Sequence, residues 1–112
     1  MSPVEATAPL QSAAPLFAAL GDETRLGLLV RLCSGGPLSI TRLSLDSTVS
    51  RQAVTKHLHV LSEAGWVRSS RCGRESLWEM EPQRFDDAHH YLQRLSRLWD
   101  DALGRLKSFV EG

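Results

Sequence analysis

Apolar residues recur at helical spacing in two segments near the start of the chain. Residues 12–20 predict a short helix, with Ser12 as its N-cap and Gly21 as its stop. Residues 22–34 predict a second helix, because Asp22 suits an N-cap and the run Gly35-Gly36-Pro37 breaks a helix. The apolar face of this second helix is expected to consist of Leu26, Leu29, Val30 and Cys33.

Two more helices and a hairpin follow. Ser39 suits the N-cap of a short helix that runs to Leu45, and Ser50 suits the N-cap of a longer one that ends at Gly65. The longer helix has core spacing at Ala53, Val54, Leu58 and Leu61. Two short segments, Trp66 to Ser70 and Glu75 to Met80, alternate partly, and the tight link Arg71-Cys72-Gly73-Arg74 between them predicts a β-hairpin.

The last helix is expected to open at Pro82 and to run to about Val110. It carries an apolar seam, in steps of three and four, at Phe85, Ala88, Leu92, Leu95, Trp99, Ala102, Leu106 and Phe109. Such a stripe covers either the core of its own domain or a second subunit. A 112-residue domain does not need this much apolar surface for its own core. A two-fold interface is therefore favoured, with contacts at Phe85, Leu92, Leu95, Trp99, Leu106 and Phe109.

Helix, turn, helix and hairpin is the order of a winged helix-turn-helix. The expected fold is mainly α, with about five helices and a two-stranded wing. Residues 1–14 are expected to form a flexible arm, and residues 15–112 a single domain that dimerises through helix 82–110 and the first helix.

Charge singles out one region of the chain. The chain has 13 basic and 13 acidic residues, so its net charge gives no reason to expect nucleic acid. From Ser50 to Arg74, however, five basic residues stand against the single acid Glu63. A cationic block in a neutral chain indicates a local patch that can bind phosphates.

Within this block, the residue types suit contact with duplex DNA. The helix from Ser50 would lie in the major groove, with Arg51, Gln52, Thr55, Lys56 and His59 facing outward. Arg and Gln can bind base edges through two hydrogen bonds, and Lys reaches phosphates. Ser50 and the helix N-terminus suit a phosphate, whereas His57 either packs behind the helix or reaches a phosphate. The hairpin tip is expected to offer Arg68, Arg71 and Arg74 to the DNA backbone.

Several stretches together resemble the ArsR/SmtB family of bacterial repressors. They are Leu16-Phe17-Ala18-Ala19-Leu20-Gly21-Asp22-Glu23-Thr24-Arg25, Ser50-Arg51-Gln52-Ala53-Val54-Thr55-Lys56-His57-Leu58, and the wing tip with Leu77-Trp78. The resemblance covers Leu16 to the C-terminus. It implies a homodimer joined by its terminal helices that binds imperfect inverted repeats in promoters. It also implies repression relieved by an inducer, which the sequence does not identify.

The family's metal-sensing motifs are incomplete here. Where one family site has Cys-x-Cys, this chain has Ser39 and Thr41. A second family site needs Asp-x-His and, about eleven residues later, His-x-x-Glu or His-x-x-His. Asp87 and His89 supply the first half, but Asp100 and Leu103 stand at the second. Shifting the motif by one residue uses His90 and Asp101, but Gly104 then stands at the remaining ligand position and cannot bind a metal through a side chain. Because zinc needs four or more ligands, we expect no metal and no other cofactor.

The two cysteines leave a redox role open. Cys33 is expected to be a small buried apolar residue. Cys72 lies between Arg71 and Arg74, where neighbouring cations favour the reactive thiolate. Oxidation of Cys72 would bring a larger group beside the wing arginines, so a thiol-responsive repressor is one alternative function.

Other function classes find less support. We find no Gly-rich phosphate loop, nucleophile elbow or zinc-protease motif, so an enzyme is not expected. Two cysteines are too few for a disulfide framework, no apolar run reaches about 18 residues, and no signal peptide is visible. The expected location is the cytoplasm, away from membranes. A winged helix that docks a protein instead of DNA remains the other alternative, although an outward apolar patch would suit it better.

Overall fold

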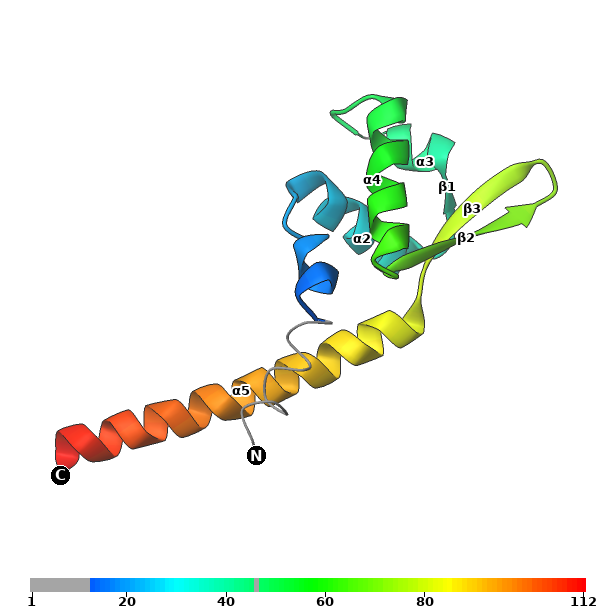
Figure 1. The fold of residues 1–112 in the computed structure, drawn as a ribbon. Coiled ribbons are helices and arrows are strands. Elements are labelled where there is room, and N and C mark those ends of the chain that lie inside the picture. Colours follow the sequence, from blue (N-terminus) through cyan, green and yellow to red (C-terminus); the bar gives the residue numbers. More distant parts are fainter. Residues whose placement is uncertain (1–12, 46) are drawn as a thin grey trace.

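The structure is a computed structural model that describes residues 13–45 and 47–112. Residues 13–18 are helical, and the further elements follow in chain order (Figure 1). They are α2 (Glu23–Gly35), β1 (Leu38–Ser39), α3 (Ile40–Leu45), α4 (Arg51–Glu63), β2 (Val67–Cys72), β3 (Glu75–Met80) and α5 (Pro82–Glu111). The fold is the expected winged helix-turn-helix. The predicted cap Ser12 and most of the predicted arm lie outside the described residues.

The helices begin and end where the sequence predicts. The carboxylate of Asp22 accepts a hydrogen bond from the Arg25 amide at 3.0 Å, and the hydroxyl of Ser50 accepts one from the Ala53 amide at 3.1 Å. Each cap satisfies an amide that has no partner inside its helix. Beyond the other ends, Gly36 and Gly65 have φ of 74° and 88°, the left-handed backbone that ends a helix.

The wing belongs to a three-stranded antiparallel sheet of order β1-β3-β2. The sequence prediction of two strands missed β1, in which Leu38 pairs with Trp78 and Ser39 with Leu77. Two residues are too few to show the alternation of a strand, so the sequence pattern could not predict β1. Ser39 still acts as a cap, because its hydroxyl accepts from the Arg42 amide at 3.2 Å. Gly73, with φ of 65°, makes the tight turn between β2 and β3.

The core lies between α2, α3, α4 and the sheet. Its most deeply buried side chains are Leu32, Leu43, Val54, Leu58 and Leu61. The first helical segment is fixed to this core by the indole nitrogen of Trp66, which donates to the Leu16 carbonyl at 2.8 Å. The predicted inward face of α4 is therefore confirmed at Val54, Leu58 and Leu61.

The predicted core face of α2 is wrong in three of its four residues. Leu28, Leu29 and Leu32 are buried, whereas Leu26, Val30 and Cys33 are exposed. α2 has apolar residues on two adjacent faces, and spacing alone did not tell which one faces the protomer's core. The second face, with Leu26, Val30 and Cys33, points toward the side from which α5 departs.

α5 gives the protomer its elongated shape. It runs for 30 residues from the sheet, and most of its length extends beyond the body formed by the other elements (Figure 1). The radius of gyration is 18.3 Å, against about 13 Å for a compact domain of this length. Among the described residues, no helix has the length and apolar character needed to span a membrane.

Candidate nucleic-acid interface

α4 presents a polar face to solvent. Its buried face fixes the rotation of the helix, so Arg51, Gln52 and Lys56 are exposed on the other side. Thr55 is partly exposed, and its hydroxyl donates to the Arg51 carbonyl at 3.0 Å. Within the described part of the chain, no carboxylate pairs with Arg51 or Lys56. These groups are thus free to bind an external ligand. α3 packs against α4, as the first helix of a helix-turn-helix does.

His57 and His59 leave α4 in different directions. His57 is turned toward α2, where its Nδ1 lies 3.4 Å from Arg25 Nη1 and 3.8 Å from Asp22 Oδ2. Of the two sequence interpretations, packing behind the helix is the one that the structure supports. His59 is exposed and meets the ring of Trp78 edge-on, with ring centroids 5.7 Å apart. It lies between the outward face of α4 and the sheet.

The arginines of the wing divide into two groups. Arg71 and Arg74 lie beside the hairpin turn, both exposed, with no ion-pair partner among the described residues. Arg68 instead faces Glu79 near the hairpin base and forms ion pairs of 3.0 Å with Glu79 and Glu81. Its predicted place at the tip is wrong, because Arg68 pairs with Glu79 at the end of the hairpin away from the turn. The hydrogen bond to Glu79 and the nearby Glu81 charge raise the pKa of Arg68.

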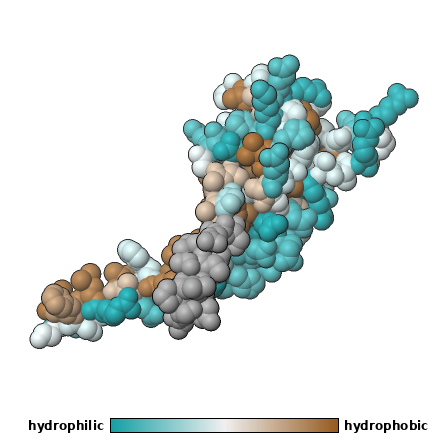
Figure 2. All heavy atoms as spheres, in the orientation of Figure 1, coloured by the Kyte–Doolittle hydropathy of each residue, from teal (hydrophilic) through white to brown (hydrophobic). Residues whose placement is uncertain are grey.

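The apolar seam of α5 is used by the protomer only at its first residues. Ala88 is buried, and Phe85 packs on Trp66 with ring centroids 5.0 Å apart. From Leu92 onward the large apolar side chains are exposed, with 50% of Leu92, 64% of Trp99 and 84% of Phe109 accessible. Figure 2 shows apolar residues gathered on this free half of α5. Of the two interpretations of the seam, cover for the protomer's own core is therefore wrong beyond Ala88.

These features agree with proteins that regulate transcription. The chain is 40% identical over 65 residues to an uncharacterised HTH-type transcriptional regulator, YuzN of Bacillus subtilis, and covers 71% of it. It is 31% identical to the arsenical resistance operon repressor of Escherichia coli, of which it covers 57%. An ArsR-like transcriptional regulator from Rhodococcus sp. RHA1 superimposes with a TM-score of 0.77 at 34% identity, over 89% of this chain and 93% of that one. The chain belongs to the ArsR family of transcriptional regulators.

A more distant solved structure has the same fold. The homodimeric winged helix-turn-helix domain of a possible ArsR-family regulator from Mycobacterium bovis matches with a TM-score of 0.65 at 23% identity, over 90% of this chain and 88% of that one. No protein-family model matches the chain.

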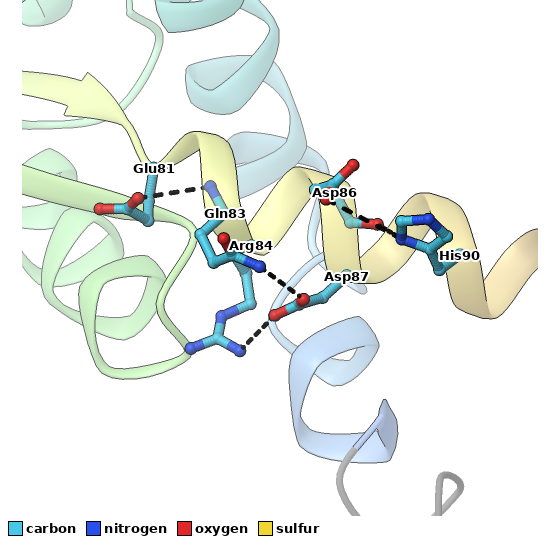
Figure 3. Close-up of polar contacts among 6 residues, drawn as sticks. All are labelled: Glu81, Gln83, Arg84, Asp86, Asp87 and His90. Carbon is cyan, nitrogen blue, oxygen red and sulfur yellow. Dashed lines mark hydrogen bonds and ion pairs between the residues drawn. The ribbon is translucent and has the colours of Figure 1, made fainter.

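In this ArsR-family chain, the acidic residues at the start of α5 contact neighbouring amide, basic and histidine groups of the same segment (Figure 3). Asp87 accepts hydrogen bonds from the Arg84 guanidinium at 3.1 Å and from the side-chain amide of Gln83 at 3.0 Å, while the His90 Nδ1 atom lies 2.9 Å from the Asp86 carbonyl oxygen. Across residues 13–45 and 47–112, no three His, Cys, Asp or Glu side chains gather as metal ligands. The carboxylate of Asp87, one residue of the incomplete family motif, is thus hydrogen-bonded within its own helix.

Arg84 is a contact that the sequence did not single out. Its guanidinium lies against Gly65, just past the C-terminal end of α4, where an added Cβ would come 2.5 Å from the Arg84 Nε atom. A larger residue there would displace the Arg84 side chain, and the φ of 88° also disfavours residues other than glycine. The first turn of α5 is therefore packed directly on the end of α4. No periodicity signals a contact of this kind.

Proposed function

We propose that the chain binds an inverted-repeat operator in duplex DNA as a homodimer and represses transcription from it. The observation that carries the proposal is the set of unpaired cations on α4 and at the wing tip, in a chain with no net charge. Exposed cations without an ion-pair partner among the described residues attract phosphates, and their binding releases the counterions held by DNA.

The two parts of this surface take different tasks in the proposal. Arg51 and Gln52, in the first turn of α4, read base edges in the major groove. Ser50, Thr55, Lys56 and His59 contact phosphates or sugars nearby, which set the register of the helix. Arg71 and Arg74 reach the backbone or the minor groove from the wing. Arg68 and His57 are left out of this contact set, because both have partners within the protomer.

A homodimer completes the proposed function. The exposed seam of α5 needs a partner, and the homodimeric relative from Mycobacterium bovis has the same fold. Two copies related by a two-fold axis present two α4 helices to half-sites about 34 Å apart, one turn of DNA. Repression follows when the bound dimer occupies promoter DNA, in agreement with the name of the Escherichia coli relative.

The experiment is fluorescence anisotropy of the reduced dimer on the DNA upstream of its own gene, with a scrambled duplex as competitor, at two salt concentrations. We expect tight binding that resists the competitor and weakens steeply with salt. Binding without sequence preference would contradict the proposal that the chain recognises a specific operator. The absence of binding to either duplex would favour the alternative of a protein-docking module. Transcription from that promoter in vitro, with and without the protein, tests repression directly.

A further inference from the structure

A pocket of about 270 Å³ lies between the first helical segment and one side of α5. Its apolar wall comes from the first segment, and its charged and polar groups come from α5. The lining includes Ala13, Leu16, Arg84, Asp87, Tyr91 and Arg94. None of these residues belongs to the apolar seam, which occupies a neighbouring face of α5. The cavity, here called the Arg94 pocket, therefore has a chemistry of its own.

The two arginines of the Arg94 pocket differ in what they contact. Arg94 follows Arg84 by ten residues, which is about 15 Å along a helix axis, so they lie at opposite ends. Arg84 forms an ion pair of 3.1 Å with Asp87, drawn in Figure 3. The side chain of Arg94 has no hydrogen-bond or ion-pair partner among the described residues. Arg94 is therefore the cation of the pocket that is available to a ligand.

Next to Arg94, the pocket offers a hydroxyl donor and an apolar wall. Tyr91 lies three residues before Arg94 and hence on the same face of α5. Its ring packs against Phe17 of the first segment, with ring centroids 5.6 Å apart. Within the part of the chain that the structure describes, the Tyr91 hydroxyl has no hydrogen-bond partner, and a phenol can donate to a carboxylate. Ala13 and Leu16 form the apolar wall opposite α5.

We propose that the Arg94 pocket binds a small organic carboxylate, with its charged end at Arg94 and Tyr91 and its apolar body against Leu16. A guanidinium binds a carboxylate through two parallel hydrogen bonds, which makes this pairing stronger than one between neutral groups. The apolar wall favours a ligand that carries hydrocarbon over a bare inorganic anion. The pocket is slightly smaller than the roughly 300–1,000 Å³ of sites for drug-sized molecules, so the ligand is expected to be small.

The lining of the Arg94 pocket is in contact with the end of α4. Arg84 lies against Gly65, just past the last turn of α4. The Leu16 carbonyl accepts a hydrogen bond of 2.8 Å from the indole of Trp66, the next residue along the chain. A ligand that changes how the first segment sits on α5 therefore acts on groups that touch the recognition helix. The carboxylate is thus an effector of operator binding, a role that rests on the proposed function; the pocket itself does not.

Calorimetric titration of the full chain with benzoate, hexanoate, benzamide and inorganic phosphate tests the ligand class. We expect both carboxylates to bind with a Kd on the order of 1 mM or tighter. Benzamide has nearly the shape of benzoate but no charge, so it should bind at least about tenfold more weakly. If neither carboxylate binds better than benzamide, the proposal is overturned. Phosphate that binds as tightly as benzoate would overturn the part assigned to the apolar wall.

Three variants locate the bound carboxylate. Arg94→Gln should weaken benzoate binding at least about tenfold, and Tyr91→Phe, which removes only the hydroxyl, should weaken it several-fold. Arg97→Gln is the matched control, because Arg97 is an exposed arginine of the same helix that does not line the pocket. Circular dichroism should show the same helix content for all three. Equal losses for Arg94→Gln and Arg97→Gln would mean that charge alone attracts benzoate to α5, and would overturn the site.

Fluorescence anisotropy on the operator tests the effector role. With saturating sodium benzoate, against sodium chloride at the same ionic strength, the operator Kd of the parent protein should change at least about fivefold. The Kd of Arg94→Gln should not change. Benzoate that binds the pocket without changing operator affinity would overturn the effector role and leave the pocket standing. A chain that binds benzoate but no DNA would instead overturn the proposed function.

Discussion

α4 and α5 are both amphipathic helices, but they expose opposite faces. α4 buries Val54, Leu58 and Leu61 completely and presents polar and basic side chains to solvent. α5 buries only Ala88 and presents a row of Leu, Trp and Phe side chains over its outer half. The apolar face of α4 is therefore fully buried within one protomer. α5, by contrast, leaves much of its apolar face in contact with water.

The difference shows how one small chain can carry two interfaces of different chemistry. A polar, cationic face is stable in water, and in the proposed function it binds DNA through its charge. An apolar face is driven to a protein partner by the hydrophobic effect. Three predictions test this division and a fourth tests the N-cap of α2; they follow in order of decreasing effect.

Leu95→Glu should have the largest effect, because it brings a charge into the middle of the apolar seam. We expect a monomer by light scattering and a loss of operator affinity of at least about 100-fold, since a monomer reaches only one half-site. Circular dichroism should show an unchanged fold. A Leu95→Glu protein that remains dimeric would place the interface elsewhere.

Leu58→Ala should act on stability and not on assembly. Leu58 is fully buried, so the truncation should lower the free energy of unfolding by about 2–5 kcal/mol through lost burial and the cavity left behind. Urea unfolding measures this change at a fixed protein concentration. Light scattering at low temperature should still show the dimer, because the seam is untouched.

Gln52→Ala and Arg74→Ala should separate base reading from phosphate binding. Gln52→Ala should cost about 1–3 kcal/mol on the operator, with little effect on scrambled DNA, if its amide binds a base edge. Arg74→Ala should weaken binding to both duplexes and reduce the salt slope by about 1. Arg68→Ala is the matched control, because its ion pairs with Glu79 and Glu81 hold it at the hairpin base. An Arg68→Ala effect equal to that of Arg74→Ala would contradict this division of the wing.

The smallest effect concerns the cap of α2. The hydrogen bond from the Arg25 amide, with the nearby His57 and Arg25 charges, lowers the pKa of Asp22. The stability that this carboxylate contributes is therefore present above the unfolded pKa of about 3.9 and is lost as the pH falls through the lower folded value. Asp22→Asn keeps a capping oxygen but does not titrate there. Urea unfolding at pH 6 and pH 3 should show that the free energy of unfolding falls slightly less for Asp22→Asn than for the parent protein. An equal fall would argue against the lowered pKa of Asp22.

The sequence predicted the elements that depend on residues close together in the chain. It missed the contacts that depend on residues far apart in the chain. Asp22, Ser50 and Gly65 act within a few residues, so the caps and helix limits could be read from the chain. The strand β1 and the contact of Arg84 with Gly65 depend on segments far apart in sequence, and the core face of α2 depends on which side α4 and the sheet occupy. For the site, the outward residues of α4 follow from its periodicity, whereas the partners of His57 and Arg68 required the fold.

The unbroken length of α5 has a consequence for operator geometry. Arg84, in the first turn of α5, contacts Gly65 just past α4, and α5 continues without a break from there to the seam. In the proposed dimer, this one helix would join the DNA-facing part of each protomer to the interface. Inserting a single residue between them would advance the body by 1.5 Å and turn it by about 100°. Seven residues would return nearly the same face, about 10 Å further on. In the proposed dimer, the spacing of the two half-sites would therefore change in discrete steps with the length of α5.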